Sequence, residues 1–175
     1  PFSTISSIFE TVLPSFLLPY FFKKMSLNNF TLEKTAKTPR IDLNKDSGEL
    51  VFSGKSIPEN AAKVYEPVLN WVSEYALKAK PITNLRLDIE YFNTASMMWL
   101  SRILVILKKI NDPEYILYIH LYMPLEEYDD MNDIDDIRDA LIPVQDILQD
   151  AIPCVGIKLY GTNNSRVIKD ALVFI

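Results

Sequence analysis

The sequence predicts a single α/β domain in which a mixed β-sheet is covered by helices, in the order β-β-α-β-α-β-α-β-β. Three observations lead to this prediction. The chain has 175 residues, 49% of them hydrophobic, which suits one domain with a sizeable core. Apolar residues repeat every second position in some segments and with three-and-four spacing in others, typical of strands and helices respectively. Turn-forming residues separate these segments, and the sequence contains no internal repeat or low-complexity tract.

The first predicted elements are a hairpin and a helix. Residues 39–43 and 49–53 alternate or run apolar, and the turn-rich segment between them ends in Gly48. Residues 56–59 open a helix, because Pro58 suits its first turn and Glu59 suits its positive end. Pro67 is expected to kink this helix or split it in two. The predicted buried stripe of the helix follows helical spacing and consists of Ala61, Ala62, Tyr65, Val68, Leu69, Val72 and Ala76.

The second half of the chain repeats the alternation of strand and helix. Residues 85–89 alternate apolar and charged, which predicts a strand with one buried face. A second helix follows residue 94, carries Met97, Leu100, Ile103, Leu104, Leu107 and Ile110 at helical spacing, and ends before Pro113. The remaining predictions are an apolar central strand at 115–123, an acidic loop at 126–139, a helix at 137–152, and strands at 155–160 and 166–175.

Residues 1–24 need a separate interpretation from the domain at 25–175. They are apolar, but Pro14 and Pro19 interrupt them, so they do not suit a spanning helix. The basic residues Lys23 and Lys24 follow the apolar stretch, whereas a secretory signal carries them before it. We expect these residues to form an extension outside the fold, because the sequence from Met25 is typical of the start of a protein. The alternatives are an arm that contacts a membrane or partner, and an integral part of the core.

Composition narrows the function classes. Eighteen basic and 23 acidic residues give a net charge of −5. Proteins that bind nucleic acids usually carry an excess of basic residues, so this composition argues against nucleic-acid binding. The single cysteine, Cys154, forms no intrachain disulfide, so a reducing, cytoplasmic location is expected. We interpret Cys154 as a buried thiol and His120 as a structural histidine with satisfied hydrogen bonds. The four glycines fit neither a dinucleotide fingerprint nor a phosphate loop, so no cofactor is expected.

An acidic run is the remaining candidate for a metal site. It contains Glu126, Glu127, Asp129, Asp130, Asp133, Asp135, Asp136 and Asp139. A calcium loop needs a glycine at its turn and a closing glutamate, but here Ile134 stands at a ligand position and neither residue is present. We interpret the run as a solvated loop, with a protein-docking surface as the alternative, and assign no metal ligand or catalytic residue.

The most informative segment is Glu90–Ser96, where a strand ends and a helix begins. Asn93 or Thr94 is expected to be the N-cap of that helix. A helix N-terminus also accommodates anions, because its first N–H groups are free and its dipole end is positive. A phosphate on Thr94 would therefore be tolerated by the fold while adding roughly −1.5 to −2 charges. This arrangement suits a switch that changes docking without unfolding the protein.

Two segments, Ser56–Ala61 and Glu90–Ser96, resemble in order and separation the motifs of the SiaC family of bacterial regulatory phosphoproteins. Thr38–Ile41 and Gly48–Leu50 resemble the opening strands of that family. The resemblance covers about Leu32 to Asp136, and the family is similar in layout to STAS-type anti-sigma antagonists. It therefore implies a STAS-like fold.

The resemblance also implies a mechanism of regulation. Thr94 matches the phosphorylated threonine of the family, which a dedicated protein kinase modifies and a PP2C-like phosphatase restores. The unmodified form binds and stimulates a diguanylate cyclase, which places the chain in cyclic-di-GMP signalling and biofilm control. The partner-binding residues implied by the two motifs are Pro58, Glu59, Asn60, Tyr91, Phe92, Asn93 and Ser96.

Two departures from the family pattern accompany this resemblance. Ala95 replaces a serine that follows the threonine, and the part from about Ile137 to Ile175 is an addition. The expected function is a non-catalytic, cytoplasmic regulator switched at Thr94, whose only possible membrane contact is through residues 1–24. The alternatives are a constitutive protein-binding scaffold and a small hydrolase that would use Asp88, Glu90 and the acidic run.

Overall fold

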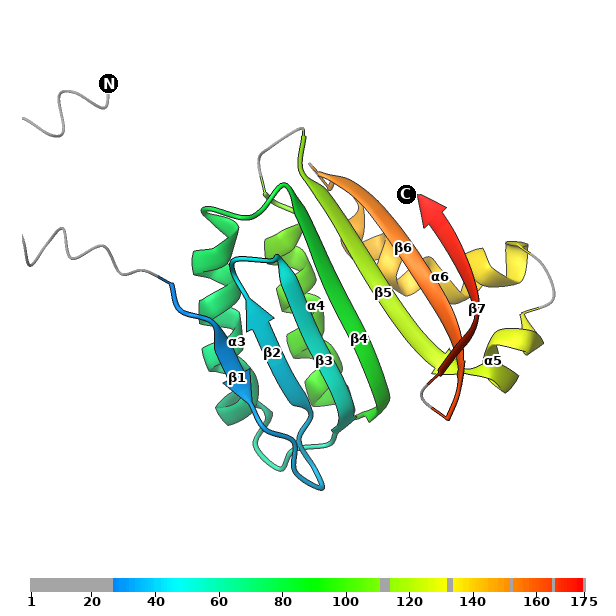
Figure 1. The fold of residues 1–175 in the computed structure, drawn as a ribbon, viewed down its shortest axis with the longest axis horizontal. Helices are drawn as coiled ribbons and strands as arrows, with labels where there is room; N and C mark the ends of the chain where they lie inside the picture. Colours follow the sequence, from blue (N-terminus) through cyan, green and yellow to red (C-terminus); the bar gives the residue numbers. More distant parts are fainter. Residues whose placement is uncertain (1–26, 111–113, 132–133, 152, 165, 175) are drawn as a thin grey trace, which may run out of the picture.

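A mixed β-sheet forms the frame of the molecule (Figure 1). The computed structural model describes residues 27–110, 114–131, 134–151, 153–164 and 166–174, so the expectation for residues 1–24 lies outside the described part. Within these ranges seven strands lie in the sheet in chain order: β1 (Phe30–Leu32), β2 (Arg40–Asn44), β3 (Glu49–Ser56), β4 (Ile82–Phe92), β5 (Ile116–Pro124), β6 (Cys154–Asn163) and β7 (Arg166–Phe174). The helices of the described part are α3 (Ala61–Ala76), α4 (Thr94–Leu107), α5 (Leu125–Asp130) and α6 (Ile134–Leu148).

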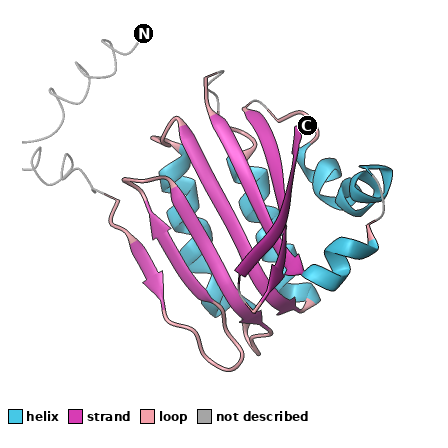
Figure 2. Ribbon diagram, turned by 45° about the vertical axis from the view of Figure 1, so that its right-hand side comes forward, coloured by secondary structure: helices cyan, strands magenta, loops and turns pink. Residues whose placement is uncertain are grey.

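Among the described residues, all helices lie on one face of the sheet. Strands β3 to β6 are mutually parallel, whereas β1, β2 and β7 pair antiparallel at the two edges. Each crossover from β3 to β6 moves one strand further in the same direction. Because such crossovers are right-handed, all of their helices pack on the same face (Figure 2). The expected α/β fold with a mixed sheet is confirmed, but the helices cover only one of its faces.

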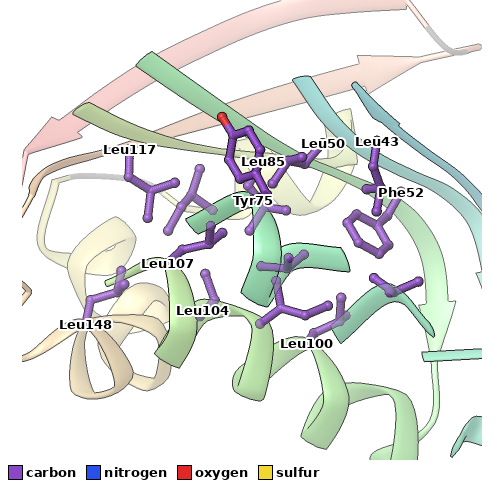
Figure 3. Close-up of a cluster of buried hydrophobic side chains, with 14 of the residues drawn as sticks. Leu43, Leu50, Phe52, Tyr75, Leu85, Leu100, Leu104, Leu107, Leu117 and Leu148 are labelled. Atoms are coloured by element: carbon purple, nitrogen blue, oxygen red, sulfur yellow. The ribbon is translucent and has the colours of Figure 1, made fainter. Parts of the chain in front are cut away.

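The hydrophobic core lies between the sheet and the helices on this face. Inward residues of the central strands, such as Leu85 and Leu117, meet the buried side of α4 and α3. Figure 3 shows this arrangement, with Leu43, Leu50, Phe52, Leu85 and Leu117 of the sheet facing Leu100, Leu104 and Leu107 of α4. The alternation within β4 and β5 thus separates an apolar inner face from a polar outer face, as expected for strands with one buried face.

Helix α3 differs from its prediction in three respects. It begins at Ala61 with Asn60 as N-cap, so Pro58 lies before the helix and is buried there. It also continues through Pro67, which is neither its end nor a division into two helices. Because Pro67 is exposed, water can reach the carbonyl group one turn earlier, which receives no hydrogen bond from proline. The buried stripe includes Trp71 and Tyr75, which the prediction omitted.

Most of the described residues of the acidic segment are helical and do not form a loop. Helix α5 occupies residues 125–130, and α6 begins at Ile134, earlier than predicted. The first turns of these helices contain the carboxylates of Glu126, Glu127, Asp135 and Asp136. The positive end of each helix dipole stabilises these negative charges. The prediction of a solvated loop was therefore wrong, because these acidic residues begin helices.

Three smaller features also differ from the predictions. Cys154 is exposed, not buried, because it is the first residue of β6 and precedes the inward-facing Val155. Strand β1 was not predicted, since its three residues give too short a pattern to detect. Strand β4 reaches Phe92 and thus includes residues expected in the following turn.

Candidate functional site

The two motifs meet where β3 and β4 end. Ser56 and Phe92 are paired residues of the parallel ladder, and the N–H group of Asn93 donates to the carbonyl oxygen of Ser56 at 3.0 Å. The carboxyl ends of adjacent parallel strands share one edge of the sheet, which brings these distant segments together. We call the segment Tyr91–Met98 the junction, because it joins β4 to α4.

Asn93 caps α4 and thereby leaves Thr94 unengaged. Its backbone is extended, its side-chain Oδ1 accepts from the N–H of Ser96 at 2.9 Å, and its carbonyl accepts from the N–H of Met97 at 3.0 Å. The prediction that Asn93 or Thr94 caps the helix is confirmed for Asn93. Thr94 is the first helical residue, is exposed, and its hydroxyl has no hydrogen-bond partner in the described part of the chain.

A buried chain of hydroxyl groups fixes the turn from below. The hydroxyl of Tyr65 lies 2.6 Å from Ser56 Oγ, which donates to Ser96 Oγ at 2.8 Å. Ser96 Oγ in turn donates to the carbonyl oxygen of Ser56 at 3.0 Å. Burial raises the pKa of Tyr65, which keeps its hydroxyl protonated and able to donate. Since Ser56 and Ser96 are fully buried, this network holds β3, α3 and α4 together at the site.

Apolar side chains surround Thr94 on the surface. Tyr91, Met97 and Met98 expose 62%, 50% and 55% of their surface, and Phe92 is also exposed. Thr94, Met97 and Met98 share one face of α4 because residues three and four positions apart are neighbours on a helix. Exposed large apolar side chains that gather in one place are typical of protein-docking surfaces.

The structure places the other predicted site residues in different roles. Asn60 caps α3 by accepting from the N–H of Lys63 at 3.1 Å, and exposed Glu59 pairs with Lys37 at 2.5 Å. Pro58 and Ser96 are buried, so they shape the turns and present no surface to a partner. Met97 and Met98 were not assigned to the site. Their helical spacing from Thr94 is the sequence feature that could have identified them as neighbours of this threonine.

His120 is held in a polar cluster on the open face of the sheet. It is 2% exposed, its Nε2 lies 2.9 Å from Asn84 Oδ1, and its Nδ1 lies 2.9 Å from the Tyr160 hydroxyl. Burial, with the positive charges of Arg86 and Lys158 adding to it, lowers the pKa of His120 to about 4. A neutral ring with both nitrogens engaged confirms the interpretation of a structural histidine.

The described residues contain no group of three or more histidine, cysteine, aspartate or glutamate side chains arranged to hold a metal ion. In the same part of the chain, no helix combines the length and apolarity needed to cross a membrane.

Comparison with known proteins gives a family match and a structural match. Residues 32–147, which include both motifs and the junction, match the model of the SiaC family regulatory phosphoproteins. An uncharacterised protein of Pseudomonas aeruginosa strain UCBPP-PA14 is 28% identical over 83 residues, or 47% of this chain. The match covers 66% of that relative, slightly less than two thirds of its length.

Three solved structures share the fold. Apo-SiaC from Pseudomonas aeruginosa is 22% identical with a TM-score of 0.54, covering 74% of this chain and 98% of its own. A second structure of SiaC from this organism is 25% identical with a TM-score of 0.50, over 59% and 90% of the two chains. A chain in the structure of the diguanylate cyclase SiaD in complex with its activator SiaC is 19% identical with a TM-score of 0.56, over 75% and 99%.

Proposed function

The chain belongs to the SiaC family of regulatory phosphoproteins, and from this premise we propose that it is a non-catalytic switch controlled by reversible phosphorylation of Thr94. One observation carries the proposal. The Thr94 hydroxyl is exposed and unengaged at the start of α4, while Asn93 and Ser96 hold the turn without it. A kinase can therefore modify this hydroxyl without breaking any contact that stabilises the fold.

The surroundings of Thr94 explain how a phosphate would act. It would add roughly −1.5 to −2 charges among the exposed side chains of Tyr91, Phe92, Met97 and Met98. A partner that covers these apolar side chains would have to remove water from the phosphate, which costs free energy. The N-terminus of α4 accommodates the same charge, so the protein would stay folded. Phosphorylation would thus release a partner that binds the unmodified junction.

The proposed target is a diguanylate cyclase, which the unmodified protein binds and stimulates. Support comes from family membership and from the likeness to a chain in the complex of the cyclase SiaD with its activator SiaC. A dedicated protein kinase and a PP2C-like phosphatase would set the state of Thr94. We place this module in the cytoplasm, within cyclic-di-GMP signalling.

The test is a titration of a purified diguanylate cyclase with wild type and two variants, each before and after kinase treatment, following cyclic-di-GMP formation. Wild type and Thr94→Ala should both stimulate the cyclase, and kinase treatment should abolish stimulation by wild type but not by Thr94→Ala. Thr31→Ala is the matched control, since Thr31 is an exposed threonine of β1, at the opposite edge of the sheet from β7. This variant should respond to the kinase as wild type does. Equal stimulation by all forms after kinase treatment would contradict the switch.

A constitutive scaffold is the second candidate. The exposed apolar side chains of the junction favour it, because they could bind a partner without any modification. In that case intact mass of the protein purified from its own cells would show no added phosphate, and kinase treatment would not change partner binding.

A further inference from the structure

The sheet separates between β4 and β5 near their carboxyl ends, as their diverging ribbons show in Figure 1. The ladder between them ends at the pair Leu87–Leu121, although β4 continues to Phe92 and β5 to Pro124. Beyond this pair β4 is joined only to β3 and β5 only to β6 within the described residues. Pro124, the last residue of β5, has no N–H group to donate toward β4. The edge of Asp88–Phe92 therefore remains open to another strand.

Two hollows flank this separation, one on each face of the sheet. The hollow on the helix side has a volume of about 340 Å³ and is lined by apolar residues such as Leu87, Leu104 and Ile147. The hollow on the open side has a volume of about 680 Å³. Ile89, Phe92 and Tyr122 line both of them, so the two hollows meet between the strands.

The open-side hollow carries an uncompensated negative charge. The carboxylates of Asp88, Glu90 and Glu127 line it. Lys55 approaches Glu90 only to 3.8 Å, with both side chains more than half exposed, so the pair is weak. Arg86, two residues before Asp88, is already bound by Glu49 at 2.6 Å. Burial and the charge of Glu90 raise the pKa of Asp88, as expected where no cation neutralises a carboxylate.

We propose that this separation receives an extended segment of a partner protein in which apolar and basic residues alternate. Successive side chains of a strand point to opposite faces of a sheet. A segment that pairs with the open edge of β4 would direct alternate residues into the apolar hollow on the helix side, and the residues between them toward the carboxylates of Asp88, Glu90 and Glu127. The backbone of β4 supplies the hydrogen bonds and the two hollows supply the selectivity. The two hollows share Tyr91, Phe92 and Met97 with the junction, so this surface adjoins the one around Thr94.

The test uses a fluorescein-labelled peptide, Val-Arg-Val-Arg-Val with both ends blocked, titrated with the full chain and followed by fluorescence anisotropy. Wild type should bind it saturably, and the affinity should fall with added salt. The double variant Asp88→Asn with Glu90→Gln keeps the shape of both side chains and should lose about tenfold in affinity. The matched control, Glu66→Gln with Glu74→Gln, removes two exposed carboxylates of α3 and should bind as wild type does.

Two further measurements separate strand addition from simple attraction of a cation. A peptide with the same sequence and N-methylated backbone amides should not bind, because it cannot pair with β4. Ser101→Trp should also weaken binding, since Ser101 lines the helix-side hollow and the indole would fill it. The proposal is overturned if wild type fails to bind at millimolar concentration. It is equally overturned if the variant at Asp88 and Glu90 binds as tightly as wild type, or if the N-methylated peptide binds as well as its parent.

Discussion

Acidification should destabilise the domain through His120. This side chain is 2% exposed and its pKa is lowered from the usual 6.5 to about 4, chiefly by burial. Above pH 6.5 the ring is neutral in both the folded and the unfolded state, so it adds no pH dependence. Between 6.5 and 4 only the unfolded state binds the proton, and the free energy of unfolding falls by about 1.4 kcal/mol per pH unit. The total loss by pH 4 is about 3 kcal/mol.

The assay is urea unfolding at a series of pH values, followed by the fluorescence of Trp71 and Trp99. Trp71 is buried and Trp99 is half-buried against Tyr65, so both report loss of the core. The reference is His120→Gln, whose amide keeps a donor and an acceptor but does not titrate. Its free energy of unfolding at pH 7 should be lower than that of wild type by about 1–3 kcal/mol, because it replaces the fitted ring imperfectly. That difference should shrink as the pH falls toward 4.

Comparison with the variant removes the contribution of other groups. Asp88, whose pKa is raised, acts in the opposite direction, since its folded form binds a proton more readily than its unfolded form as the pH falls. It contributes equally to wild type and variant. The chain has one histidine, so its ring signals in an NMR titration give the pKa of His120 directly. A pKa near 6.5, or parallel stability profiles for the two proteins, would refute the reasoning.

Four other perturbations test the junction and the extension. Thr94→Ala should change the free energy of unfolding by less than about 0.5 kcal/mol, whereas Asn93→Ala should cost about 0.5–2 kcal/mol, because only Asn93 caps α4. Chemical unfolding measures both, and a larger loss at Thr94 would contradict the assignment of the cap. Ser96→Ala should cost about 1–3 kcal/mol by leaving the buried Ser56 hydroxyl without its acceptor. Its control is Ser101→Ala, because the Ser101 hydroxyl donates only to the Met97 carbonyl oxygen of its own helix. A chain that begins at Met25 should melt cooperatively within a few degrees of the full chain, and loss of cooperative melting would place residues 1–24 in the core.

The sequence predicted well those features that depend on which face of an element is buried. The alternation at residues 85–89 placed a strand with one apolar face, and β4 has that face toward the helices. The position of Asn93 and Thr94 between a strand and an apolar helix predicted the capped turn, which the structure confirms. These signals are local, so they can be detected without knowledge of the partner elements.

Features that depend on what packs against an element were not predictable. Met97 fits the buried stripe of α4 by spacing, yet it is half exposed, because it lies in the first turn where β4 and β5 have already separated. The acidic run had the composition of a loop, but its carboxylates stand at helix starts, where they are favourable. The separation of β4 and β5 follows from strand register, which no single segment encodes.

The buried hydroxyl chain of Tyr65, Ser56 and Ser96 has a consequence for how such proteins diversify. It places the conformational stability of the turn beneath the surface, in residues with no exposed area. Tyr91, Met97 and Met98 stand outside this chain of bonds and can be exchanged with little cost to folding. Under the proposed function, mutation of these side chains would alter partner choice around a fixed threonine, so that duplicated copies of one scaffold would acquire separate partners and remain insulated from each other within a cell.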